Sequence, residues 1–142
     1  MTADKVWIVD DDRSIRWVLE KALMQEGLEA TAFEDAQTLL NKLGKEKPHA
    51  IVTDIRMPGI DGLTLLAKIR LEHPDVPVIV MTAHSDLDSA VSSYQGGAFE
   101  YLPKPFDVDD AINLVKRAIA HHHEQQQISI PVLAATKGVD II

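Results

Sequence analysis

Acidic, hydroxyl and amine side chains stand directly after apolar runs at four places in the chain. Asp10 and Asp11 follow the first run, Asp54 follows a second, and Thr82 and Lys104 follow two later ones. If these runs are neighbouring parallel strands, their carboxyl ends lie at one edge of a sheet, where ligands bind. Clustered carboxylates raise each other's pKa, and a hard divalent cation relieves that repulsion. Mg²⁺ fits best, because it takes few protein oxygens and binds phosphate oxygens, and the D-x-D-x-D-G loop typical of Ca²⁺ is absent.

The elements that must position these residues follow from the hydrophobic pattern. Short apolar runs alternate with segments of helical period about five times, and Asp107 or Asp109 would cap the last helix. Such an order requires right-handed crossovers and a mainly parallel sheet with helices on both faces. The predicted strands are 6–9, 28–33, 50–53, 76–81 and 99–102, and the predicted helices are 15–23, 35–44, 63–69, 87–94 and 111–118.

Length and composition exclude several classes of protein. The 142 residues suit one packed domain and are too few for a TIM barrel, and no apolar stretch reaches the length of a membrane span. The net charge of −8 argues against direct contact between this segment and nucleic acid. Without cysteine there is no disulfide or thiolate site, and the start lacks a secretory signal pattern, so we expect a cytoplasmic protein.

Four motifs stand at or near the ends of the predicted strands. They are Val9-Asp10-Asp11-Asp12, Asp54-Ile55-Arg56-Met57-Pro58-Gly59-Ile60-Asp61-Gly62, Met81-Thr82-Ala83-His84 and Tyr101-Leu102-Pro103-Lys104-Pro105. Together they resemble the receiver domain of two-component response regulators, over roughly residues 5–120. Within that family the sequence is most similar to nitrogen regulators of the NtrC type. The resemblance implies a flavodoxin-like (CheY-like) fold, a doubly wound parallel sheet of five strands.

The resemblance implies that Asp54 accepts a phosphoryl group from the phosphohistidine of a kinase. Asp10 and Asp11 would hold Mg²⁺ together with Asp54 and the backbone carbonyl of Arg56. Which two of the three consecutive aspartates bind the metal is less clear from the residues alone. An ungapped match to the family selects the first two and leaves Asp12 as a cap of the first helix.

The resemblance also assigns roles to residues after the later strands. Thr82 would donate its hydroxyl to a phosphoryl oxygen, and Lys104 would pair with another. The resemblance also favours a cis peptide bond between Lys104 and Pro105. Taken singly, Thr82 is more typical of a β-branched residue at a strand end, and Lys104 is more typical of a solvated surface lysine. Tyr101 would move into the space that Thr82 vacates on switching, and Arg56 and His84 would control access of water to the phosphoryl group.

Other functional classes explain the residues less well. A phosphatase with an aspartate nucleophile needs a second aspartate two positions after the first, as general acid, and this chain has Arg56 there. We therefore predict that the chain is not an enzyme that turns over external substrates. A flavin-binding protein would need a phosphate-binding loop, and neither the Walker nor the Rossmann glycine pattern occurs. A pure interaction module would leave the convergent polar edge unexplained.

The segment after the last predicted helix changes in character. We assign residues 1–122 to the receiver domain and 123–142 to a linker toward an absent output domain, with 128–142 showing no helical period. The run His121–His123 reads as a solvated helix end, with metal binding or a tag as the alternatives. Family resemblance implies an NtrB-like sensor histidine kinase as partner, a homodimer on phosphorylation, and ATPase and DNA-binding domains in a longer chain that controls nitrogen-responsive transcription.

Overall fold

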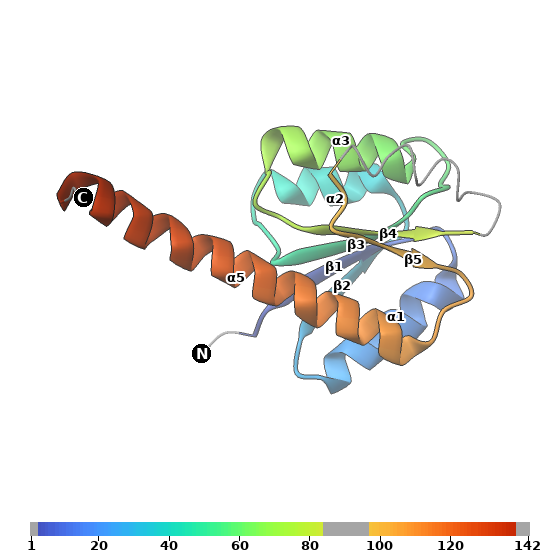
Figure 1. Ribbon diagram of the computed structural model, residues 1–142. Helices are drawn as coiled ribbons and strands as arrows, with labels where there is room; N and C mark the ends of the chain where they lie inside the picture. The colour runs from blue at the N-terminus through green and yellow to red at the C-terminus, as the bar shows by residue number, and fades with distance from the viewer. Residues whose placement is uncertain (1–2, 84–96, 139–142) are drawn as a thin grey trace.

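A computed structural model describes residues 3–83 and 97–138, and they form a five-stranded sheet with helices on both faces (Figure 1). All strand pairs are parallel, and the strand order is β2-β1-β3-β4-β5. The flavodoxin-like fold expected from the sequence is therefore confirmed. The strands are β1 (Lys5–Val9), β2 (Glu29–Phe33), β3 (Ala50–Asp54), β4 (Val78–Thr82) and β5 (Glu100–Pro103), and the helices are α1 (Arg13–Gln25), α2 (Ala36–Leu43), α3 (Gly62–Glu72) and α5 (Val108–Gly138).

Alternating side chains along the strands divide the core into two layers. In β1, Trp7 and Val9 pack toward α2 and α3, whereas Val6 and Ile8 pack toward α1 and α5. Figure 1 shows the same division, with α2 and α3 on one face of the sheet and α1 and α5 on the other. Every residue of β3 and β4 is buried, as expected for central strands covered on both faces.

Helix caps agree with the pattern of the sequence. The Asp12 carboxylate accepts hydrogen bonds from the backbone amides of Ser14 and Ile15, so it caps α1. Asp107 accepts from the amide of Asp109 at 3.0 Å at the start of α5, which selects the first of the two predicted caps. The predicted helix over 87–94 lies outside the described residues.

The end of the chain differs from the expectation. Helix α5 continues without a break to Gly138, although residues 128–142 have no helical period. Its last turns extend away from the sheet in Figure 1, so they have no core to cover and need no apolar stripe. Extending an existing helix avoids the cost of nucleation. The boundary between 122 and 123 stays a prediction.

The run of histidines was also only partly predicted. His122 is buried at 7% exposure, and its Nδ1 donates to the backbone carbonyl of Asp75 at 2.9 Å, so the expectation of a wholly solvated helix end is wrong at this residue. The helix turns one of three consecutive side chains toward the domain while its neighbours stay exposed. In the described part of the chain, no helix combines the length and apolar character needed to cross a membrane.

Candidate functional site

The strand order brings the predicted polar residues to one edge of the sheet. In the strand order, β2 lies on one side of β1, whereas β3, β4 and β5 lie on the other. The strand order therefore reverses between β1 and β3, and in doubly wound sheets ligands bind at such a switch point. Asp10 follows β1, Asp54 ends β3, Thr82 ends β4, and Lys104 follows β5. Because all these strands are parallel, the four side chains leave the same edge.

Lys104 joins two of these strand ends. Its Nζ lies 3.1 Å from Oδ2 of Asp10 and 3.2 Å from Oδ1 of Asp54. Its backbone amide donates to the carbonyl of Thr82 at 2.6 Å, which fixes the lysine beside β4. The Lys104–Pro105 peptide bond is cis, as the resemblance favoured. The predicted convergence of ammonium and carboxylates is therefore present.

Burial governs the electrostatics of the cluster. Desolvation raises the pKa of Asp10, and hydrogen bonds from the Asp12 amide and Lys104 oppose it only in part. Burial and the charge of Asp10 raise the pKa of Asp54, again against the effect of Lys104. Burial alone would lower the pKa of Lys104, but its contacts with the two carboxylates outweigh this and raise it. The site therefore carries more negative charge than one lysine neutralises.

The donor set suits a magnesium ion. Carboxylate oxygens of Asp10, Asp11 and Asp54 lie within 4.8 Å of one another, and Asp11 is exposed while the other two are buried. Hard carboxylate oxygens with one side open to water match what Mg²⁺ accepts in proteins. Asp12 takes no part in this cluster because its carboxylate caps α1. The acidic cluster thus contains Asp10 and Asp11 and not Asp12, and the binding of a metal by these residues stays a prediction.

Thr82 carries an unused hydrogen-bonding group. The residue is fully buried, and within residues 3–83 and 97–138 its Oγ1 is the one buried side-chain polar atom without a partner. An unsatisfied buried hydroxyl costs free energy and is uncommon in folded proteins. Thr82 ends β4, one position after Met81, which pairs with Asp54 in the register of β3 and β4.

The remaining predicted residues are placed less completely. Arg56 is exposed in the loop after β3, and Tyr101 is half-buried on β5, where it packs against the layer under α3. The roles predicted for Arg56, including that of its carbonyl, and for Tyr101 are not tested by these positions. His84 lies outside the described residues.

Two residues that position the backbone at Asp10 and Asp54 were not predicted from the sequence. The guanidinium of Arg16 donates to the backbone carbonyl of Asp10 at 2.8 Å and holds the first loop in place. Gly62 begins α3 so close to β3 that a Cβ there would collide with the carbonyl oxygen of Asp54. Its amide also donates to the carbonyl of Ile55 at 3.0 Å. The Asp61-Gly62 pair was visible as a motif, but its packing was not.

Comparison with known proteins agrees with this geometry. The family model "Response regulator receiver domain" matches residues 6–116. The chain is 62% identical over 122 residues to the DNA-binding transcriptional regulator NtrC of Escherichia coli K12, covering 86% of this chain and 26% of that protein. It is 40% identical to the C4-dicarboxylate transport regulator DctD of Pseudomonas aeruginosa over 81% of the chain and 25% of that protein. The chain thus spans about a quarter of the length of these relatives.

Solved structures lead to the same family. The solution structure of the apo receiver domain of nitrogen regulatory protein C has a TM-score of 0.79 and 58% identity, covering 87% of this chain and 99% of that one. The crystal structure of NtrX from Brucella abortus with ADP has a TM-score of 0.84 and 32% identity, covering 90% and 30%. With its acidic edge, buried threonine and strand-end lysine in place, the chain belongs to the response regulator receiver family and is similar to receivers of the NtrC type.

Proposed function

We propose that this chain accepts a phosphoryl group on Asp54 from the phosphohistidine of an NtrB-like sensor kinase and passes the signal to a transcriptional output. The observation that carries the proposal is the meeting of Asp10, Asp54 and Lys104 within 3.2 Å contacts beside the unpartnered hydroxyl of Thr82. An ordinary strand-end aspartate would need neither a second buried carboxylate nor an orphan donor. A phosphoryl group on Asp54 would supply the acceptor oxygen that the Thr82 hydroxyl lacks.

Two contacts of Asp54 in the described residues are made by the same carboxylate oxygen. Lys104 and the amide of Ile55 both contact Oδ1, at 3.2 Å and 3.0 Å, so we expect Oδ2 to form the new bond to phosphorus. As that bond forms, the bond from phosphorus to the donor's imidazole nitrogen breaks and its electron pair stays on the imidazole, which takes up a proton. The product is an aspartyl phosphate and a free histidine.

The other residues stabilise charge that develops during transfer. Lys104 is already at the carboxylate and would follow the charge to a phosphoryl oxygen, and Thr82 would donate its hydroxyl to another. Asp10, Asp11 and Asp54, with the carbonyl of Arg56, would hold Mg²⁺. When bound, Mg²⁺ offsets the negative charge that the carboxylates and the phosphoryl group bring together.

Regulation would follow from the same contacts. A phosphoryl group that draws Thr82 inward would open space for Tyr101, which lies half-buried on the adjacent strand. We assign the output to ATPase and DNA-binding domains of a longer cytoplasmic chain, with residues 123–142 as the linker and phosphorylation favouring a homodimer. Nitrogen-responsive control is supported by the identity to NtrC receivers.

We also expect that this chain does not turn over external substrates. Arg56 occupies the place of the second aspartate that a phosphatase of this chemistry would use as general acid, and it is exposed in the loop after β3. Arg56, and His84 beyond the described part of β4, would instead set how fast water reaches the phosphoryl group. The chain would then promote only its own phosphorylation and dephosphorylation.

Phosphotransfer from a purified, autophosphorylated NtrB-like kinase tests the proposal. We expect label to move from the kinase to this chain within the mixing time in Mg²⁺, and to stay on the kinase when the acceptor is Asp54→Asn. Asp61→Asn is a matched control, because Asp61 caps α3 through the amide of Thr64 and lies outside the acidic cluster. Transfer to the Asp54→Asn variant would contradict the assignment.

A further inference from the structure

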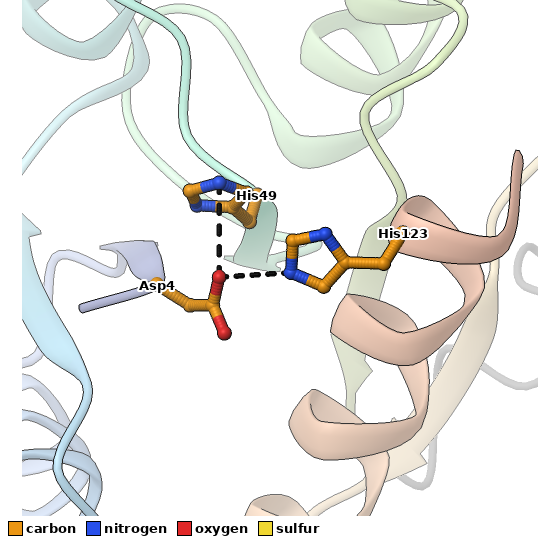
Figure 2. Close-up of side chains that lie close together, drawn as sticks. All are labelled: Asp4, His49 and His123. Carbon is orange, nitrogen blue, oxygen red and sulfur yellow. Dashed lines mark hydrogen bonds and ion pairs between the residues drawn. The ribbon is translucent and has the colours of Figure 1, made fainter. Parts of the chain in front are cut away.

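A second cluster of ligand side chains lies at the opposite end of the sheet from Asp54. It consists of Asp4 just before β1, His49 just before β3, and His123 on α5 (Figure 2). Each of the three residues comes from a different part of the chain. In Figure 2 both imidazole rings approach the same carboxylate oxygen of Asp4. The cluster is outside the phosphoacceptor site and has no part in the chemistry proposed above.

The distances in this cluster match a metal centre. Oδ1 of Asp4 lies 2.9 Å from Nε2 of His123 and 3.7 Å from Nε2 of His49. Two ligands at about 2.05 Å from a tetrahedral Zn²⁺ are separated by about 3.3 Å, a value between these two. The three donor atoms all lie within 4.8 Å of one another. Only small side-chain movements would be needed to enclose an ion.

The three consecutive histidines do not act together as a chelating tag. The ring of His121 lies 5.4 Å from that of Phe99 between centroids, tilted by 48°, and Nδ1 of His122 donates to the backbone carbonyl of Asp75 in the segment between α3 and β4. His123 alone of the three reaches Asp4. Successive helical residues point about 100° apart. The His122 ring lies 5.4 Å from that of His49 and 5.7 Å from that of His123 between centroids, but its Nδ1 is bound to Asp75. The site therefore depends on the folded domain rather than on the local run.

We propose that Asp4, His49 and His123 form a binding site for a divalent transition metal ion, with Zn²⁺ as the preferred occupant. Two imidazoles and one carboxylate are ligands that Zn²⁺ favours, and they leave a fourth position for water. The ion would tie α5, where it leaves the domain, to the start of β1 and to the segment before β3. The site is separate from the Mg²⁺ cluster, which offers carboxylates alone.

Proton positions set the strength of this site. Nδ1 of His49 accepts a hydrogen bond from the amide of Lys5 at 2.9 Å, so the neutral ring carries its proton on Nε2. Metal binding at Nε2 would move that proton to Nδ1 and release the Lys5 amide, which is only half-buried, to water. His123 donates from Nε2 to Asp4, and a neutral ring would have to move that proton to Nδ1 before Nε2 could bind the ion. We therefore expect weaker binding than in a four-ligand structural zinc site.

Burial supports the neutral form of the ring that binding needs. Desolvation lowers the pKa of His49, and the positive charges that His122, His123 and Lys5 would bring act in the same direction, against the attraction of Asp4. A neutral imidazole has a free lone pair at neutral pH and is the form that coordinates metals.

Titration calorimetry with ZnCl₂ in excess Mg²⁺ tests the site, because Mg²⁺ occupies the acidic cluster at Asp54. We expect one Zn²⁺ per chain, and a dissociation constant at least about tenfold higher in His49→Gln and in His123→Gln. His121→Gln is the matched control, since the His121 ring contacts Phe99 and is not part of the cluster with Asp4. Its affinity should stay within about twofold of wild type. Circular dichroism of each variant checks that the fold is kept.

Absorption spectroscopy with Co²⁺ in place of Zn²⁺ gives an independent reading. Nitrogen ligands in tetrahedral geometry give intense visible bands, whereas the all-oxygen cluster at Asp54 gives weak ones. We expect these bands in the wild-type chain and their loss in both His49→Gln and His123→Gln. Three results would overturn the proposal: no Zn²⁺ binding in excess Mg²⁺, equal weakening in His121→Gln, or unchanged binding in His49→Gln. The last would leave the Asp4–His123 contact as an ion pair only.

Discussion

Replacing Lys104 by alanine in metal-free solution should cost the fold measurable stability. The ammonium lies 3.1 Å from Asp10 and 3.2 Å from Asp54, and its removal leaves two buried carboxylates without a cation. At an effective dielectric constant of about 20, each attraction is worth about 5 kcal/mol before desolvation is counted. Breaking a fully buried pair costs about 3–5 kcal/mol.

Solvent reduces that figure here. The Lys104 side chain is 24% exposed, and the carboxylates it leaves can take up protons because their pKa values are already raised. We therefore expect a loss of about 2–3 kcal/mol in the free energy of unfolding. Mg²⁺ should recover most of the loss, since it brings its own positive charge to the same oxygens.

Urea unfolding followed by circular dichroism, in EDTA and in Mg²⁺, measures both effects. Lys116→Ala is the matched control, because Lys116 pairs with Glu26 at 2.6 Å on the surface, with side chains 51% and 34% exposed. Such a pair is worth under about 1 kcal/mol and should not respond to Mg²⁺. A smaller loss of unfolding free energy in Lys104→Ala than in Lys116→Ala, or an equal loss with and without Mg²⁺, would show that Lys104 does not neutralise the two carboxylates.

Three further predictions concern the same site. Because the folded protein raises the pKa values of Asp10 and Asp54, the stability that these two groups contribute in metal-free solution is fully present below the ordinary value of 3.8 and is lost as the pH rises through the raised values. Asp54→Asn should therefore melt at a higher temperature than wild type at neutral pH. Equal melting temperatures would disprove this. Thr82→Ala should leave the free energy of unfolding within about 1 kcal/mol of wild type, because the lost hydroxyl has no partner, while slowing phosphorylation by acetyl phosphate; Thr82→Ser should restore the rate. Gly62→Ala should destabilise the chain by about 1–3 kcal/mol in urea unfolding through collision with the backbone of Asp54 and Ile55, and no loss would show that α3 shifts freely.

Periodicity and strand ends made most of the phosphoacceptor site predictable. Asp10, Asp54, Thr82 and Lys104 each follow an apolar run, and parallel strands must deliver such residues to one edge. The choice among the three consecutive aspartates was harder, because it depends on the hydrogen bonds that Asp12 makes with amides of the first helical turn. That capping pattern was recognisable once the helix start was placed.

Contacts between distant segments could not be read in this way. Arg16 reaches a backbone carbonyl, and backbone atoms carry no sequence signal. The close approach of Gly62 depends on how α3 packs, which periodicity does not specify. His49 and His123 are 74 positions apart, and nothing local to either predicts that both face Asp4. Hydrophobic patterns locate elements, whereas the facing of individual polar side chains depends on packing angles and register.

The extended helix α5 shows another limit of pattern reading. Amphipathic period signals a helix only where one face is covered by a core. The last turns of the helix extend away from the sheet, so their sequence needs no apolar stripe, and the absence of a helical period there does not argue against a helix. The part of α5 that packs on the sheet, with Ala111, Val115 and Ala118 buried, was predicted from its spacing.

Intact-protein mass spectrometry after incubation with acetyl phosphate and Mg²⁺ tests, without a kinase, whether Asp54 accepts a phosphoryl group. We expect a gain of one phosphoryl group that is labile to base, requires Mg²⁺, is lost with a chelator and is absent in Asp54→Asn. No gain in folded, Mg²⁺-bound protein, or an equal gain in Asp54→Asn, would contradict it.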